Sequence, residues 1–151
     1  SPTGVLGVHS TLPLSGPAAD TSGEFNNNGI QATADGKTLI VAHSGQGALN
    51  TVGPTTGASE TIAGVSVPSV DGILLEGGRL FAVQNFLNQI AEVRLSPDLT
   101  SGTVQNVVTS ELFQVPTAVA RFGDRLATVN AKFDTGLPPT ADQYEVIIVD
   151  R

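Results

Sequence analysis

The chain has 151 residues and contains no cysteine. Disulfide bonds, thiol catalysis and zinc sites built from cysteine are therefore excluded. Positive charge is also scarce, because seven Lys and Arg against 14 Asp and Glu give a net charge of −7, and no cluster of basic residues occurs. Binding to nucleic acid or to an anionic membrane surface is disfavoured, since both need a basic surface.

Long apolar runs and helix-forming runs are also missing. The longest uninterrupted aliphatic stretch lies near residues 146–149, whereas a membrane span needs about 18 apolar residues. In their place the chain has 17 Gly and nine Pro, which favour many tight turns over helical bundles or βαβ units. With 40% hydrophobic residues, the sequence predicts a globular, all-β chain that forms one domain.

The chain contains an internal repeat. Three stretches can be laid over one another: residues 28–41, 71–83 and 116–129. Each begins with a small polar step, continues as an apolar strand, turns at Asp or Gly, and enters a second strand centred on Leu39, Leu80 or Leu126. These leucines lie 41 and 46 residues apart. A repeat of about forty residues made only of short strands is typical of the blades of a β-propeller.

We therefore predict about three four-stranded blades, at residues 28–66, 71–110 and 116–151. The strands are expected at residues 29–33, 38–42, 48–52 and 61–65, at 73–75, 80–83, 89–95 and 103–109, and at 118–121, 126–129 and 145–149. Residues 1–15 are interpreted as two outer strands of a preceding blade, at 5–8 and 11–14. Because propellers close with about four to eight blades, three blades would form half of a six-bladed ring.

The opening steps of the repeats are candidate functional positions. Equivalent positions of successive blades converge on the axis of a propeller, so Asn28, Asp71 and Thr117 should meet there. The loops 43–48, 84–88 and 130–143 should wall the cavity. An Asn carbonyl and an Asp carboxylate suit a hard cation such as Ca²⁺, which takes about 6–8 oxygen ligands. Asn-Gly and Asp-Gly are also strong turn signals, so each step taken alone favours a turn residue over a metal ligand.

The same steps carry a family resemblance. Asn-Gly-Ile at 28–30, Val-Asp-Gly-Ile at 70–73 and the segment 74–95 resemble successive blades of the SMP-30/gluconolactonase/LRE family of six-bladed propellers. The resemblance covers nearly the whole chain, but only the C-terminal half of such a propeller. In that family a Glu, an Asn and an Asp hold a divalent metal on the axis. The motifs place this Asn at Asn28 and this Asp at Asp71, and no residue matches the Glu.

The resemblance implies a divalent-metal-dependent hydrolase of lactones or esters. Ca²⁺ is the first choice of metal, with Zn²⁺ or Mn²⁺ as alternatives. Asp71 is the candidate for a catalytic role beyond metal ligation, because Asn28 cannot titrate. Four further residues are expected to contact a small-molecule substrate: Asn27, His43, Asn85 and Thr117. Of these, His43 is also a candidate general base.

Two other functions remain open: a propeller enzyme of different chemistry, such as a cyclase or isomerase, and a binding propeller without catalysis. In each case a partner is expected, because a terminal blade without a neighbour exposes an apolar flank. The partner would be the N-terminal half of the propeller as a second chain, or a second copy in a homodimer. The acidic, Lys-poor composition favours a secreted protein over a cytoplasmic one.

Overall fold

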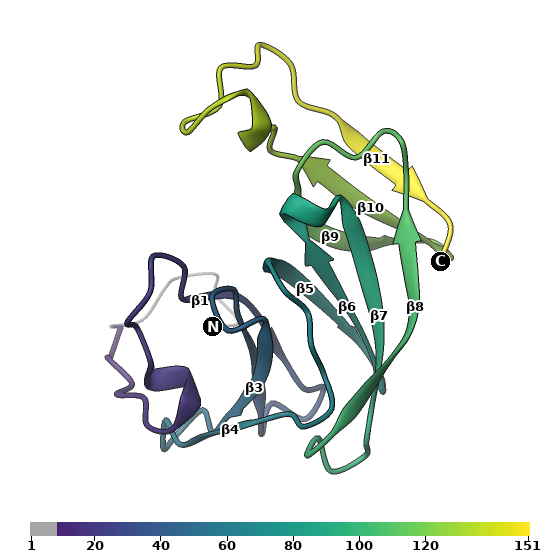
Figure 1. The fold of residues 1–151 in the computed structure, drawn as a ribbon. Helices are drawn as coiled ribbons and strands as arrows, with labels where there is room; N and C mark the ends of the chain where they lie inside the picture. The colour runs from purple at the N-terminus through teal and green to yellow at the C-terminus, as the bar shows by residue number, and fades with distance from the viewer. Residues whose placement is uncertain (1–8) are drawn as a thin grey trace.

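The computed structural model describes residues 9–151, which form three antiparallel sheets (Figure 1). The first sheet contains β1 (Asn27–Ala32), β2 (Leu39–His43), β3 (Ala48–Val52) and β4 (Ser59–Thr61); the second contains β5 (Val70–Glu76), β6 (Arg79–Gln84), β7 (Gln89–Leu95) and β8 (Gly102–Thr109). The third contains β9 (Pro116–Phe122), β10 (Arg125–Asn130) and β11 (Val146–Val149). The helices are the short 3-10 turns η1 (Pro17–Ala19), η2 (Asn85–Leu87) and η3 (Phe133–Thr135). None of the described helices is long and apolar enough to cross a membrane.

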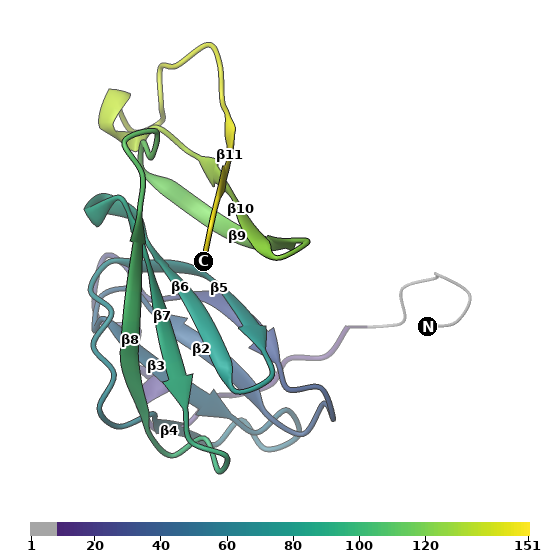
Figure 2. The ribbon, with the colours of Figure 1, turned by 90° about the vertical axis from the view of Figure 1, so that its right-hand side faces the viewer.

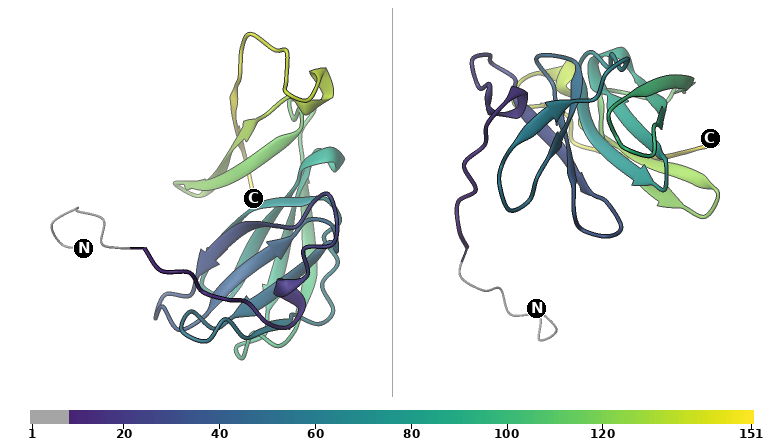
Figure 3. Two further views of the ribbon diagram at one scale, coloured as in Figure 1. Left: turned by 90° about the vertical axis from the view of Figure 1, so that its left-hand side faces the viewer. Right: turned by 90° about the horizontal axis from the view of Figure 1, so that it is seen from below.

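The three sheets are arranged as blades around an inner edge. In each sheet the strands follow one another outward in sequence order. The first strands of the sheets, β1, β5 and β9, are spatial neighbours, and the second sheet lies between the other two (Figures 1 and 2). Seen from below, the sheets splay apart from one another (Figure 3). The predicted all-β propeller architecture is confirmed, with four strands in each of the first two blades and the three strands expected at residues 116–151 in the third.

The core lies between the blades. Side chains of a strand alternate between the two faces of its sheet. In β6, Leu80 and Ala82 therefore pack in the cluster shared with the first blade, whereas Phe81 and Val83 pack in the cluster shared with the third. All four are fully buried. A strand that is covered on both faces needs a continuous apolar run, which explains the sequence of β6.

Each inner strand has a β-bulge near its start, where its register against the next strand shifts. The bulged residues are Asn28 and Gly29 in β1, Asp71 and Gly72 in β5, and Thr117 in β9. A bulge adds an unpaired residue and changes the direction of its side chain. The polar steps predicted as the openings of the repeats are thus equivalent in structure, and they are bulges rather than hairpin turns.

The N-terminal segment differs from its prediction. Residues 5–8 lie outside the described part of the chain, and the predicted strand at 11–14 is not formed. Instead, Ser15 makes an isolated parallel bridge to Ala58, and Ala18 packs against Val41 and Val52. Pro17 begins a 3-10 turn directly after Gly16, whose φ is 74°, which interrupts an extended strand. This segment therefore covers the first blade and forms no described strand of a preceding one.

Strand ends show a smaller difference in the first blade. The outer strand expected at residues 61–65 is shorter and earlier in the structure, at Ser59–Thr61. Gly64 has a φ of 75°, a left-handed conformation that a continuing strand cannot adopt. By contrast, β3 and β7 have the predicted bounds.

Candidate functional site

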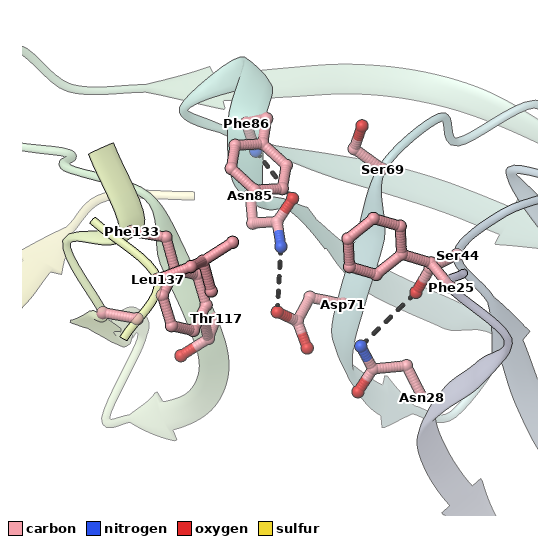
Figure 4. A pocket seen from close by; sticks show the side chains of 11 residues that line it. Phe25, Asn28, Ser44, Ser69, Asp71, Asn85, Phe86, Thr117, Phe133 and Leu137 are labelled. Carbon is pink, nitrogen blue, oxygen red and sulfur yellow. Dashed lines mark hydrogen bonds between the residues drawn. The ribbon is translucent and has the colours of Figure 1, made fainter. Parts of the chain in front are cut away.

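The three bulges open onto one pocket of about 530 Å³. Asn28, Asp71 and Thr117 all line it, each from the inner strand of a different blade (Figure 4). A second equivalent set also lines it: Ser44, Asn85 and Ala131. These residues directly follow β2, β6 and β10. The pocket is therefore built from the same two backbone positions in all three blades.

Asp71 lies in the middle of this pocket (Figure 4). The Asn85 Nδ2 atom donates a hydrogen bond of 3.0 Å to Asp71 Oδ2. In turn, Asn85 Oδ1 accepts a hydrogen bond of 2.7 Å from the backbone N–H of Phe86, which fixes the orientation of the amide. The Asp71 carboxylate is thus held by a side chain that the 3-10 turn η2 positions.

Burial dominates the electrostatics of Asp71. Loss of water raises the pKa of its carboxyl group above the ordinary 3.8, while the side-chain amides of Asn85 and Asn28 act in the opposite direction. Of the described residues that line the pocket, Asp71 alone is ionisable. A negative charge at Asp71 therefore has no positive side chain of the lining to balance it, and a bound cation would stabilise the ionised form.

Asn28 links the first blade to the second. Its Nδ2 atom donates to Ser44 Oγ at 3.3 Å, and the Ser44 hydroxyl donates to the backbone carbonyl of Val70. Because Val70 directly precedes Asp71, this chain of hydrogen bonds ties the bulge of β1 to the bulge of β5. Both predicted metal-ligand residues are therefore connected in one polar network.

The donor set fits a hard divalent cation in part. Asp71 offers a carboxylate, Asn28 an amide oxygen and Thr117 a hydroxyl, which are the oxygen types that Ca²⁺ binds. Within residues 9–151 no group of three His, Cys, Asp or Glu side chains is placed to hold a metal ion. The oxygen atoms of Asp71, Asn28 and Thr117 resemble the ligands of Ca²⁺ more than those of Zn²⁺, which prefers nitrogen and sulfur. Further oxygen ligands would have to come from water or from another blade.

Two predicted substrate contacts are not brought to the pocket. The Asn27 Nδ2 atom donates to the Ala18 carbonyl at 2.7 Å. His43 is buried, with Nε2 2.9 Å from the Asp20 carbonyl and Nδ1 accepting from the Gln46 N–H at 3.2 Å. Since both ring nitrogens are engaged by backbone groups, His43 holds the N-terminal segment on the first blade. The structure thus places Asn27 and His43 beside the site, whereas Asn85 and Thr117 line it.

The sequence predicted the loops that wall the pocket but not the apolar side chains that line it. Three of the six phenylalanines, Phe25, Phe86 and Phe133, line it together with Leu137 and Ser69. Phe25 and Phe86 have exposed fractions of 54% and 50%. Phe86, Phe133 and Leu137 belong to loops that were predicted to wall the cavity. An aromatic residue in an otherwise polar loop was the signal that would have found two of them.

Neither a protein-family model nor a curated protein matches the chain. Solved structures, in contrast, match the chain. The Malassezia sympodialis allergen Mala s 1 matches with 18% identity and a TM-score of 0.60, over 82% of this chain and 41% of its own. A proposed 6-phosphogluconolactonase from Bacteroides uniformis matches with 9% identity and a TM-score of 0.60, over 92% and 41%. The β-propeller domain of Myceliophteria thermophila Cps50 (Swd1) matches with 19% identity and a TM-score of 0.58, over 95% and 46%.

These similarities establish the fold. The chain is a β-propeller arc, and it spans less than half the length of each of these three structures. Their names describe different proteins, as is usual for a fold that carries many functions. The comparisons support the propeller architecture without singling out the SMP-30/gluconolactonase/LRE family.

Proposed function

We propose that the axial pocket is part of the active site of a divalent-cation-dependent hydrolase of small lactones or esters. The observation that carries this proposal is the Asp71 carboxylate, which is half-buried beside oxygen donors of the neighbouring bulges and has no positive partner in the lining. The similarity to a proposed lactonase is consistent with this function at the level of the fold.

Asp71 and Asn28 would hold the cation, with the Thr117 hydroxyl as a third oxygen donor. Ca²⁺ suits this set best, and Mn²⁺ or Zn²⁺ are the alternatives. When bound, the cation would polarise the carbonyl of the substrate and stabilise the negative charge that develops on its oxygen. Asn85 orients the Asp71 carboxylate through its 3.0 Å hydrogen bond.

Asp71 is also the group of the lining that can take up a proton. Burial raises the pKa of its carboxyl group, and a bound cation would counter this effect and keep the group ionised, the form that can accept a proton. The apolar body of a substrate would rest on the phenylalanine walls, which exclude water from the reacting carbonyl.

The proposal includes further propeller blades. The outer face of the third blade exposes Val146 and Ile148, with exposed fractions of 63% and 37%, and such apolar surface favours association. The N-terminal half of the same propeller as a second chain, or a second copy of this chain, would cover it. The remaining ligands of the cation would come from these blades or from water.

A binding propeller without catalysis is the second candidate. It is favoured by one observation, namely that Asp71 is accompanied in the lining by neutral and aromatic side chains only. A propeller enzyme of cyclase or isomerase type is the third candidate, and an intact pocket that binds substrate without a cation would favour it.

The test is lactone and ester hydrolysis by this chain assembled with the blades that complete its ring, followed in a pH-stat with Ca²⁺ or with a chelator. The matched variants are Asp71→Asn and Asp124→Asn, since Asp124 is an exposed carboxylate in the turn between β9 and β10. We expect cation-dependent turnover that Asp71→Asn lowers by about 100-fold or more, and that Asp124→Asn leaves unchanged. Equal turnover by both variants, or none by the unaltered chain with any of the three cations, would overturn the proposal. Ligand binding without turnover would support the second candidate.

A further inference from the structure

We propose that the axial pocket also binds organic ammonium ions that carry an apolar body, with the ammonium group at Asp71 and the body against the phenylalanine walls. This ligand class goes beyond the proposed hydrolysis. It rests on the charge, the aromatic walls and the hydrogen-bond acceptors of the pocket.

The described lining of the pocket carries only negative charge. Asp71 is the single ionisable side chain among the described lining residues. The nearest basic residue along the lining loop, Lys132, stands between Ala131 and Phe133, but its Nζ atom lies 2.7 Å from Glu145 Oε1. Its charge is therefore balanced outside the pocket. An anionic ligand would meet only Asp71, whereas a cationic ligand would find its counter-ion there.

The aromatic residues surround this charge. Phe25 lies on one side of Asp71 and Phe133 with Leu137 on the opposite side, while Phe86 lies over Asn85 (Figure 4). The faces of aromatic rings attract an ammonium group that comes within about 6 Å of the ring centre. Phe25 and Phe86 are also about half exposed, so a ligand with an apolar body would remove their rings from water.

The neutral polar residues of the lining also suit an ammonium group. The Thr117 hydroxyl and the Asn28 amide oxygen can accept N–H groups, which an ammonium ion offers. A hard metal ion needs about 6–8 oxygen ligands, but an organic ammonium is satisfied by one carboxylate, a few acceptors and aromatic faces. Since both cations would use Asp71, an ammonium ligand is expected to compete with a divalent cation.

The experiment uses three ligands of one shape and different charge. The full chain is titrated by calorimetry, in the presence of a chelator, with 4-phenylbutylamine, 4-phenylbutanol and 4-phenylbutyrate. We expect the amine to bind about tenfold or more tightly than the alcohol, and the acid to bind more weakly than both. Equal affinity for the three ligands, or tighter binding of the acid, would overturn the proposal without any variant.

Variants then locate the site. Asp71→Asn is expected to reduce the affinity for the amine to that for the alcohol, and to leave the alcohol unchanged, which also shows that the variant is folded. Phe86→Ala is expected to weaken both ligands several-fold. Phe122→Ala is the matched control, because Phe122 has an exposed fraction of 54%, like Phe25, but lies at the end of β9 and does not line the pocket. Loss of amine binding in the control, or its retention in Asp71→Asn, would place the amine elsewhere.

The chelator separates this inference from the proposed function. Binding of the amine without a metal, together with an absence of lactone turnover, would sustain the inference and remove the hydrolase. Lactone turnover without binding of the amine would overturn this inference and leave the proposed hydrolase in place.

Discussion

Gly29 lies directly against the backbone of Asp71. A Cβ atom at position 29 would collide with the Asp71 carbonyl oxygen and lie 2.9 Å from the backbone nitrogen of Ile73. Gly72 has the same relation to the next blade, since its Cβ would lie 2.5 Å from the carbonyl oxygen of Thr117. The glycines that follow Asn28 and Asp71 therefore each allow the bulge of the next blade to approach, which brings the polar side chains to one pocket.

Gly29→Ala is predicted to destabilise the protein by about 1–3 kcal/mol, the usual cost of overpacking. The cost is steric, because Gly29 is not among the residues with positive φ. Gly23→Ala is the control, as its Cβ would meet no atom closer than 3.6 Å, and it should change the free energy of unfolding by less than about 0.5 kcal/mol. Urea unfolding measures both. Equal effects of the two variants would contradict the close packing of the bulges.

The pH dependence of stability should report on Asp71. Burial raises the pKa of its carboxyl group in the folded state, so the folded state holds this proton to a higher pH than the unfolded chain. The stabilising contribution is therefore complete below the ordinary pKa of 3.8 and is lost as pH rises through the folded pKa.

Asp71→Asn removes this titration. The free energy of unfolding of the variant minus that of the unaltered protein should rise from about pH 3 to a plateau near neutral pH. The difference is needed because the carboxyl groups of Asp20, Asp35 and Asp98 have lowered pKa values and act in the opposite direction. Urea unfolding of both proteins at several pH values measures this difference in the free energy of unfolding. A difference that stays flat or falls with pH would show that burial does not control Asp71.

Arg151 is predicted to stabilise the contact between the second and third blades. Its Nη1 atom lies 2.7 Å from Glu76 Oε2, and its guanidinium carbon lies 5.7 Å from the ring centre of Phe81. Arg151→Gln should cost about 1–3 kcal/mol, because the side chain of Arg151 is only 17% exposed and the bond is charge-assisted.

Lys37→Gln provides the comparison for this ion pair. The Nζ atom of Lys37 is 3.8 Å from Asp35 Oδ2, and its side chain is 83% exposed, so its loss should cost about 0–0.5 kcal/mol. Thermal unfolding of both variants measures the two losses of stability. A larger loss from Lys37→Gln than from Arg151→Gln would contradict the assignment.

His43→Ala is predicted to reduce stability without changing the proposed lactone hydrolysis. The substitution leaves the Asp20 carbonyl and the Gln46 N–H without their partner, at a cost of about 1–3 kcal/mol. The measurement is kcat/KM at a temperature where the variant is fully folded, together with its unfolding midpoint. A large loss of kcat/KM at unchanged stability would instead make His43 the general base that the sequence suggested.

Much of the fold could be predicted from the sequence because the repeat is local. The alternation of apolar residues and the Gly turns define strands such as β3 and β7 whatever the rest of the chain does. Residues 11–14 show the limit of this reasoning. Their short apolar pattern suits a strand, but the N-terminal segment docks through Ser15 and Ala18 on the first blade, and a sequence pattern does not specify a docking partner.

The site could be predicted in part for the same reason. Asn28, Asp71 and Thr117 were found because equivalent positions of a repeat must meet in a ring. Asn27 and His43 lie outside the described lining because neighbouring residues of a strand point to opposite faces, and the bulges shift that alternation. Phe25 was missed because it lies outside the loops predicted to wall the cavity, and a loop phenylalanine has no periodic pattern to reveal that it lines a pocket.

The central claim is that Asp71 binds a cation on the propeller axis. Calorimetric titration of the full chain with Ca²⁺ tests this claim most directly. We predict one ion per chain, with affinity at least about tenfold lower in Asp71→Asn and unchanged in Asp124→Asn. Equal affinity in all three proteins would place the ion elsewhere. An absence of binding to the unaltered chain, with Mn²⁺ and Zn²⁺ as well, would contradict the claim.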